Sequence, residues 1–237
     1  THTPKDPQRI MANKSLHTPR GIARFPKLVT PDQFDTSSKP AYSTGLVFDP
    51  KDPEVQTFVE TLEGIHKKAE AELRKELQEA ITNAKNGAEA KKAKKKLDDL
   101  EIPSFIREVL DRESGEPTGM IEIKFKTNAD DKDGNRKALR FFDGSGKAFK
   151  LTEDMWSGSV LRVNFNPSTF YIAGVGKLFL TNYINAVQVL ELKQGSGGST
   201  AGDMFGGDTS DFEAPTEPSF NDGVEEISAD SVTDGDY

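Results

Sequence analysis

The 237-residue chain contains no cysteine, and its C-terminal segment contains no basic residue. The lack of cysteine excludes disulfides, thiolate zinc sites and cysteine nucleophiles. No apolar run approaches the roughly 20 residues of a membrane-spanning helix, so we expect a soluble intracellular protein with no membrane partner. HExxH, Walker and GxSxG motifs are also missing, and His2, His17 and His66 stand far apart, as expected of solvent-facing or capping histidines. These absences favour a binding protein over an enzyme, with no metal and no cofactor.

The net charge of −8 conceals an uneven distribution. Residues 194–237 carry eleven of the 39 acids and no Lys or Arg, which leaves residues 1–193 with 28 acids against 31 bases, a net charge of +3. A basic body joined to an acidic segment indicates nucleic acid or another charged partner. Because residues 195–199 are a Gly/Ser linker and the segment beyond them is poor in aliphatics, we expect residues 194–237 to form a disordered acidic tail.

Apolar and polar residues alternate along short stretches of residues 16–193, which predicts strands. The expected strands lie within residues 16–34, 45–48, 119–126, 138–143, 147–151, 159–165, 170–173 and 178–192. Residues 1–15 are polar and without period, so they are expected to form a flexible arm, and 35–44 a loop. Residues 103–110 are expected to form a short turn or helix.

A helical insertion is expected at about residues 53–100. Asp52 is a good N-cap, Pro53 suits the first helical position, and apolar residues then recur at helical spacing to about Asn83. A second, lysine-rich helix is expected from Ala88 to about Leu100. Short strands interrupted by one helical insertion predict a mainly β, α+β domain at residues 16–193, best matched by a five-stranded OB-fold barrel, although periodicity does not separate this fold from other small barrels.

Basic and aromatic residues are interleaved on the predicted strands, a combination that suits single-stranded nucleic acid. Cations follow the phosphates, and rings stack on unpaired bases at about 1–3 kcal/mol per base. The candidate contacts from this pattern are Arg20, Arg24, Lys124, Phe125, Lys126, Arg140, Arg162, Phe170 and Tyr171. Because successive side chains on a strand point to opposite faces, not every ring can face outward. Phe125 points into the core if its two neighbouring lysines face outward, and only one of Phe141 and Phe142 belongs to the core. Tyr171 is favoured over Phe170 as the outward ring because of its hydroxyl.

The end of the tail adds a second signal. Asp230, Asp234 and Asp236 precede the aromatic Tyr237. An acidic segment on a flexible linker can compete with DNA for a cationic groove, or can offer an aromatic anchor to basic patches on partner proteins.

Several blocks together resemble the single-stranded-DNA-binding proteins of lytic podophages. The blocks are residues 21–34, 46–53, 65–71, 121–126 and 158–192, followed by the acidic tail that ends in an aromatic residue. The resemblance implies an OB fold, sequence-independent binding of single-stranded DNA, annealing, homodimerisation, and a role in replication, recombination and repair in the cytoplasm of an infected bacterium. It also implies that the tail contacts DNA polymerase and helicase–primase, with DNA as its competitor.

By position, the resemblance adds Lys39 to the candidate DNA contacts and places others near Lys124, Phe125/Lys126 and Phe170/Tyr171. Tyr237 stands where the family has a terminal aromatic that looks to be Phe elsewhere. The lysine-rich insertion at 84–100 departs from the family pattern.

Two further hypotheses remain open from the residues alone. One is a replication scaffold that binds proteins without significant DNA affinity. The other is a nuclease or another metal enzyme that uses Asp130, Asp131 and Asp133. These acids resemble the start of a calcium loop, but no Glu follows at its twelfth position, so a solvated turn with Gly134 at positive φ fits the residues better.

Overall fold

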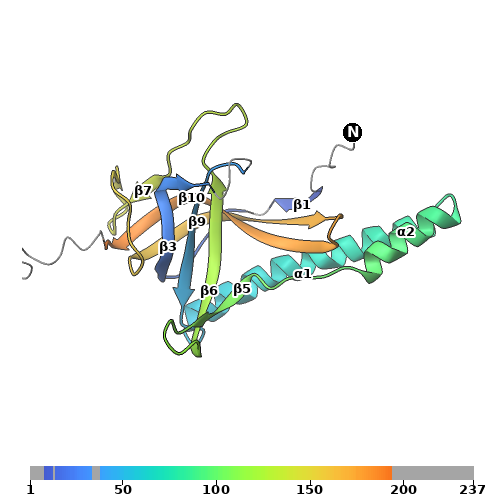
Figure 1. Ribbon diagram of the computed structural model, residues 1–237, viewed down its shortest axis with the longest axis horizontal. Coiled ribbons are helices and arrows are strands. Elements are labelled where there is room, and N and C mark those ends of the chain that lie inside the picture. The colour runs from blue at the N-terminus through green and yellow to red at the C-terminus, as the bar shows by residue number, and fades with distance from the viewer. Residues whose placement is uncertain (1–7, 13, 34–37, 194–237) are drawn as a thin grey trace, which may run out of the picture. The chain divides into compact units, whose positions relative to one another are not determined.

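A computed structural model describes residues 8–12, 14–33 and 38–193, and within them the chain forms ten strands and two helices (Figure 1). The strands are β1 Gln8–Ala12, β2 Leu16–His17, β3 Gly21–Asp32, β4 Ala41–Phe48, β5 Ile106–Leu110, β6 Pro117–Asn128, β7 Arg140–Phe142, β8 Ala148–Phe149, β9 Val160–Ile172 and β10 Lys177–Glu191. The helices are α1 Pro53–Thr82 and α2 Gly87–Asp98.

Five of these strands close into a barrel. β4 lies between β3 and β6, and β10 continues the sheet by parallel pairing with β6. β10 is also antiparallel to β9, and β9 returns to the start of β3, which completes the ring. A closed five-stranded ring in the order β3–β4–β6–β10–β9 confirms the predicted OB-type barrel with its helical insertion between the second and third ring strands.

Buried and half-buried residues alternate along the first part of β9, and the buried ones form part of the barrel core. Leu161, Val163 and Phe165 are fully buried, whereas Arg162 and Asn164 between them are half-buried. The Phe165 ring meets that of Phe125 edge-on, with 5.0 Å between centroids. This period-two pattern is the one expected of strands with a single buried face, and it fixes the register of the site described below.

α1 begins where the sequence predicts, because its first turn is capped. The Asp52 carboxylate accepts a hydrogen bond from the Glu54 N–H at 2.8 Å, and Pro53 occupies the first helical position. The first half of α1 packs Val55, Phe58 and Leu62 against the barrel core.

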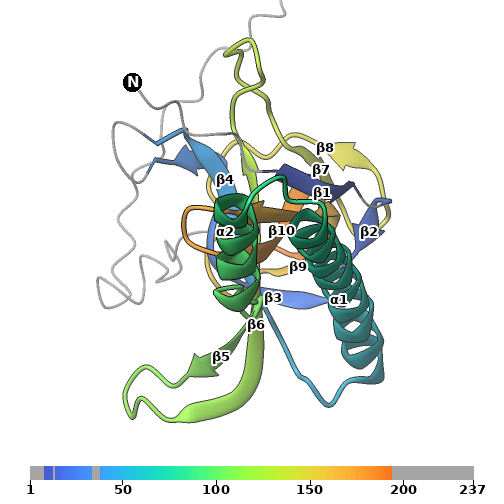
Figure 2. The ribbon, with the colours of Figure 1, turned by 90° about the vertical axis from the view of Figure 1, so that its right-hand side faces the viewer.

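The second half of α1 packs against a ribbon that leaves the barrel. Ala69, Leu73 and Leu77 form a separate apolar cluster with Tyr171 of β9 and Leu178 of β10. The β9–β10 hairpin therefore extends past the barrel alongside α1 towards α2, as Figures 1 and 2 show. No helix in the described part of the chain is long and apolar enough to cross a membrane.

Four local expectations from the sequence were wrong. Gln8–Ala12, expected within the flexible arm, form β1 against the Ser168–Tyr171 part of β9. Residues 106–110 form β5 rather than a turn or helix, because they pair with β6. β4 begins at Ala41, within the expected loop. His66 is buried and its Nε2 lies 3.2 Å from the Leu178 carbonyl oxygen, so it is neither solvent-facing nor a cap.

Candidate nucleic-acid interface

The register of β3, β4 and β6 gathers four cations on the outer surface of the barrel. Arg24, Gly45 and Lys124 lie in one cross-strand row, and Lys27, Ser43 and Lys126 in the next. Lys27, Lys124 and Lys126 are exposed, and Arg24 is half-buried. Because neighbouring strands are about 4.8 Å apart, the two sets of cations flank the small residues of β4 at a separation of roughly 10 Å. We call Arg24, Lys27, Lys124 and Lys126 the basic face.

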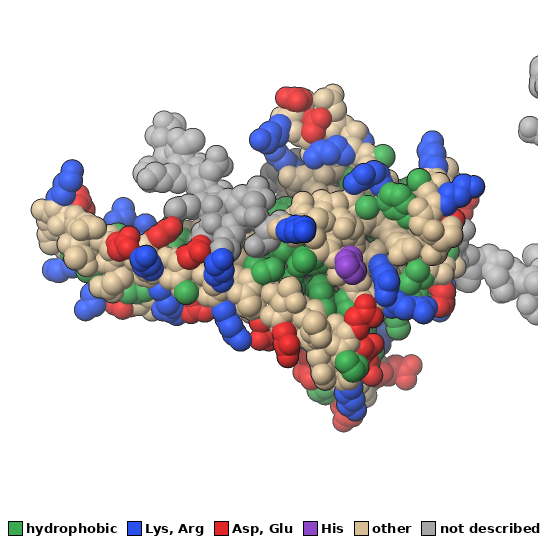
Figure 3. Space-filling model, turned by 180° about the vertical axis from the view of Figure 1, so that it is seen from behind, with side chains coloured by type: hydrophobic (Ala, Val, Ile, Leu, Met, Phe, Trp, Pro, Cys, Tyr) green, Lys and Arg blue, Asp and Glu red, His purple; other side chains and the backbone are tan. Residues whose placement is uncertain are grey.

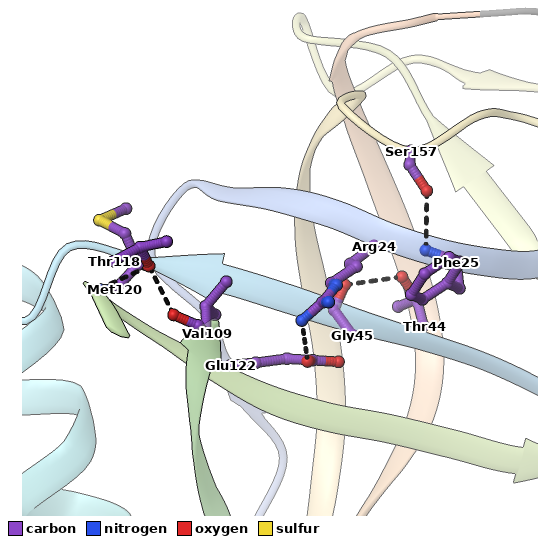
Figure 4. Close-up of polar contacts among 9 residues, drawn as sticks. All are labelled: Arg24, Phe25, Thr44, Gly45, Val109, Thr118, Met120, Glu122 and Ser157. Atoms are coloured by element: carbon purple, nitrogen blue, oxygen red, sulfur yellow. Dashed lines mark hydrogen bonds and ion pairs between the residues drawn. The ribbon is translucent and has the colours of Figure 1, made fainter. Parts of the chain in front are cut away.

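A carboxylate sits within this face. Glu122 of β6 lies over Gly45, where an added Cβ would collide with its carboxylate, and its Oε2 accepts from Arg24 Nη1 at 3.1 Å (Figure 4). The Glu122 side chain is only 9% exposed. Gly45 is therefore required by the close approach of Glu122, and Arg24 is held in place by the carboxylate that partly neutralises it.

One exposed ring lies beside Arg24, and a second belongs to the residue before Ser157, whose hydroxyl contacts the Phe25 backbone. Phe25 is 71% exposed, and its ring centroid lies 5.3 Å from Arg24 Cζ. Its φ of 48° is in the left-handed region, where a bulky residue is strained, and it occurs at the irregularity between Arg24 and Lys27 where Pro26 interrupts the β3–β4 ladder. The Phe25 N–H donates to Ser157 Oγ at 2.9 Å, and the preceding residue, Trp156, is 55% exposed. Neither ring is among the candidate contacts given above, although Phe25 belongs to a group of interleaved basic and aromatic residues with Arg20, Arg24 and Lys27, and the exposure of both rings is what base stacking requires.

The outer surface continues past Lys126 into a polar pocket. Tyr183 of β10 stands beside Lys126, and Asn166 of β9 stands beside Tyr183. A cavity of about 470 Å³ follows, lined by Asn164, Asn166, Asn185, Lys137 and Arg140 among others. Asn185 Nδ2 donates to Asn164 Oδ1 at 3.1 Å, and Asn166 Nδ2 donates to Asn185 Oδ1 at 3.1 Å. Arg140 also lines a neighbouring apolar groove with Phe142 and Phe149.

Three other predicted cations do not belong to the two cross-strand rows of the basic face. Arg20 is exposed and pairs with Glu191 at 3.2 Å. Arg162 of β9 pairs with Glu54 of α1 at 3.4 Å, and its Nε is buried without a hydrogen-bond partner in the part of the chain that the structure describes. Lys39 is exposed in the segment that precedes β4.

Of the three rings predicted to contact DNA, Phe125 and Tyr171 are buried and Phe170 is half-buried. Phe125 is fully buried, as strand parity predicted, so its ring cannot stack on a base in this conformation. The preference for Tyr171 as the outward ring was wrong: Tyr171 is 5% exposed and packs against α1, whereas Phe170 is half-buried and stacks on Phe179 at 5.8 Å. Of the other pair, Phe141 is buried and Phe142 half-buried.

The acids of residues 130–133 form a turn. Asp130 Oδ1 accepts from Arg136 Nε at 2.7 Å, and Asp131 accepts from the backbone N–H groups of Asp133 and Asn135. The Asn135 bond is the main cause that lowers the pKa of Asp131, and Gly134 has a φ of 86°. Within the described ranges, no three His, Asp or Glu side chains gather as metal ligands would. Asp230, Asp234, Asp236 and Tyr237 lie outside the described residues.

Cations are spread widely over the surface rather than confined to one strip. Seen from behind, Lys and Arg side chains lie both over the barrel and along the helices, where they alternate with acidic side chains (Figure 3). Ion pairs within α1, such as Lys67–Glu63 at 3.0 Å and Arg74–Glu70 at 2.8 Å, account for part of this mixture. The basic face differs because Glu122 pairs with Arg24 alone, and Lys27, Lys124 and Lys126 have no carboxylate within 4 Å among the described residues.

A closed five-stranded barrel whose first and third ring strands, β3 and β6, carry cations on the outside is an OB-type fold, a class that binds oligonucleotides and oligosaccharides. No protein-family model matches the chain, and no curated protein matches it by sequence. Among solved structures, the chain is similar to gp2.5, a single-stranded DNA binding protein encoded by bacteriophage T7, with a TM-score of 0.56 and 20% identity over 80% of this chain and 98% of that one.

The single-stranded DNA-binding protein from bacteriophage Enc34 is also similar. The C-terminal truncation of that protein has a TM-score of 0.46 and 11% identity, over 76% of this chain and 87% of that one. Its complex with ssDNA has a TM-score of 0.43 and 13% identity, over 76% of this chain and 88% of that one. The likeness to gp2.5 confirms the predicted resemblance to phage single-stranded-DNA-binding proteins at the level of the fold.

Proposed function

We propose that the chain is a sequence-independent single-stranded-DNA-binding protein of phage DNA replication, a stoichiometric binder without catalysis. The observation that carries the proposal is the basic face, in which Lys27, Lys124 and Lys126 are exposed beside the small residues of β4. The fold shared with T7 gp2.5, whose name states that it binds single-stranded DNA, supports the same conclusion.

The proposed mechanism combines charge and stacking. Phosphates lie along the basic face, and unpaired bases stack on the exposed rings of Phe25 and Trp156. Neither interaction reads base identity, because every nucleotide has a phosphate and a π-face. The polar pocket beside Tyr183 and Arg140 would accept nucleotides at the far end of the same path.

The acidic tail is proposed to regulate this face. The last described residue, Lys193, accepts a hydrogen bond through its carbonyl oxygen from the Trp156 N–H at 2.7 Å, so the tail is attached beside an exposed ring. Eleven acids follow it in the chain. A tethered anion at this place competes with DNA at high effective concentration, and DNA binding releases it.

The wider role extends from this activity. Coating of single strands would promote annealing and serve replication, recombination and repair. The released tail would recruit the phage DNA polymerase and helicase–primase through its acids and Tyr237. We further propose that the protein acts as a homodimer in the cytoplasm of the infected bacterium.

The deciding experiment compares Lys124→Gln/Lys126→Gln with Lys67→Gln/Lys75→Gln, which removes the same charge from α1. Binding of poly-dT is followed by gel shift and fluorescence across salt. Each phosphate contact contributes about 0.7 to the log–log salt slope, so the loss of two lowers the slope by about 1.4 and the affinity at 0.1 M salt by about 25-fold. The control should retain the wild-type slope. Equal behaviour of the two variants, or no binding by the wild type at low salt, would refute the proposal.

Truncation after Lys193 tests the tail separately. The shortened protein should bind single-stranded DNA more tightly than the full chain at low salt, because the competing acids are gone. Unchanged affinity would remove the tail from the mechanism while leaving the basic face in place.

A further inference from the structure

A second cationic site lies on the helical insertion, apart from the basic face. A cavity of about 360 Å³ is enclosed by Lys92, Lys95 and Lys96 of α2, by Tyr171 of β9 and by the turn that joins β9 to β10. This is the place at which the extended hairpin meets α2 (Figure 2). We call it the α2 pocket.

The three lysines of the pocket share one side of the helix. Positions 92, 95 and 96 are separated by three and four residues, the spacings at which helical side chains are neighbours. Among the described residues, none of the three has a carboxylate partner within 4 Å, unlike Lys67 and Lys75 of α1. Unpaired like charges at these spacings destabilise a helix, so the cluster is unfavourable unless an anion joins it.

The Tyr171 hydroxyl gives an independent indication of a ligand. Tyr171 is 95% buried, it lines the α2 pocket, and its Oη has no hydrogen-bond partner among the described residues. A buried hydroxyl without a partner is costly, and such groups in native proteins usually have a bound partner. A phenol is protonated at neutral pH and can donate a hydrogen bond, and burial and the nearby Asp99 raise the pKa of Tyr171 further.

The dipole of α2 and the carboxylate of Asp99 compensate only part of the charge of the three lysines. Lys95 and Lys96 lie in the last turn of α2 and favourably face its negative end, but Lys92 does not. Of the described residues that line the cavity, Asp99 is the one acid, so the charge of this lining is +2. The turn approaches the end of α2 closely because residue 176 is glycine. A Cβ at this position would come within 2.7 Å of the Asp99 carbonyl oxygen, and the φ of Gly176 is 68°.

We propose that the α2 pocket binds a backbone phosphate of single-stranded DNA, with Lys92, Lys95 and Lys96 as cations and the Tyr171 hydroxyl as donor. This inference rests on the proposed function and gives the lysine-rich insertion a role in it. DNA long enough to pass from the basic face to α2 would engage both sites, and a short oligonucleotide would not need the second.

The test compares Lys92→Gln/Lys95→Gln with Lys91→Gln/Lys94→Gln, which has the same spacing, helix and charge but lies outside the pocket lining. Gln keeps the helix propensity of Lys. Binding is measured with oligo-dT of about 6 nucleotides, within the range one OB fold occupies, and of about 30 nucleotides. For the longer strand the pocket variant should lose up to about 0.7 in salt slope, the contribution of one phosphate, and up to about fivefold in affinity at 0.1 M salt, with the control unchanged. Both variants should bind the short strand as the wild type does.

Tyr171→Phe separates the hydroxyl from the charges. It keeps the packing of the ring and should weaken binding of the long strand several-fold at unchanged salt slope. Equal affinities of the pocket variant and its control on the long strand would overturn the inference. If inorganic phosphate alone perturbs Tyr171 in NMR spectra while the long strand does not distinguish the variants, the pocket serves a free phosphate compound and the assignment to DNA is wrong. The proposed function fails separately, when the wild type does not bind single-stranded DNA.

Discussion

Replacement of Glu122 by glutamine should tighten the binding of single-stranded DNA, although it removes a hydrogen-bonded ion pair. Glu122 holds Arg24 through a 3.1 Å contact within the basic face. A phosphate on the opposite side of the Arg24 guanidinium would be about 7 Å from this carboxylate, the span of two hydrogen bonds and the guanidinium. The carboxylate therefore orients Arg24 but repels the phosphate that Arg24 would bind.

The size of the effect follows from Coulomb's law. Two unit charges about 7 Å apart repel by about 0.6 kcal/mol in water and by about 2.4 kcal/mol at an effective dielectric constant of about 20. Removal of the charge should thus raise the affinity by between about threefold and fiftyfold, closest to threefold because the face is solvated and screened by salt. The salt slope should become steeper by up to about 0.7 as Arg24 gains a phosphate contact. Loss of the pair should lower the unfolding free energy by about 1 kcal/mol or less.

The assay is fluorescence titration of wild type, Glu122→Gln and Glu70→Gln with oligo-dT from low to moderate salt. Glu70→Gln removes an equivalent Arg–Glu pair, Arg74–Glu70 at 2.8 Å, from α1. It should leave affinity close to that of the wild type. Affinity of Glu122→Gln equal to or below that of the wild type, in a protein with unchanged cooperative unfolding, would refute a phosphate at Arg24.

Three further outcomes are expected. Phe25→Ala and Trp156→Ala should each weaken binding by about 1–3 kcal/mol if a base stacks on the ring, with little change in salt slope; calorimetric titration measures this, and unchanged affinity in both would contradict the stacking account. Asp52→Ala should lower the unfolding free energy by about 1 kcal/mol through loss of the α1 cap, measured by urea denaturation, whereas loss below about 0.3 kcal/mol would mean that the cap is redundant. Burial lowers the pKa of His66 below 6.5, so the unfolded chain takes up the proton first and stability should fall as pH drops below about 6.5; thermal melts of wild type and His66→Gln should differ in pH dependence there, and parallel curves would show that His66 does not titrate in that window.

The sequence predicted the features that depend on local rules. The start of α1 was predictable because Asp52 and Pro53 are strong local signals, and the inward position of Phe125 followed from strand parity. β5 was not predictable, since residues 106–110 are extended only by pairing with β6. Tyr171 was misplaced for a similar reason: β9 continues beyond the barrel, and α1 covers the side of the hairpin that carries its ring.

The candidate site was predictable in composition but not in arrangement. Arg24 and Lys124 were identified as cations on strands, yet their alignment across Gly45 depends on the register of three strands separated in sequence by the helical insertion. Trp156 had no signal, because the segment that carries it is brought to β3 by a long-range hydrogen bond, which the Phe25 N–H donates to Ser157 Oγ. Long-range register is set by the whole barrel, and local propensity carries no information about it.

Closure of the barrel has a consequence for how the chain folds. Gly21 of β3 pairs with Leu161 of β9, and β6 is joined to the rest of the ring by its pairing with β10, so the ring cannot close before the last two long strands exist. Contacts of such long sequence separation form slowly. During synthesis, the outer edges of β3 and β6 stay open, and chains ending before β10 should aggregate through these edges. Stable fragments of this protein are therefore expected only from truncations that spare Glu191.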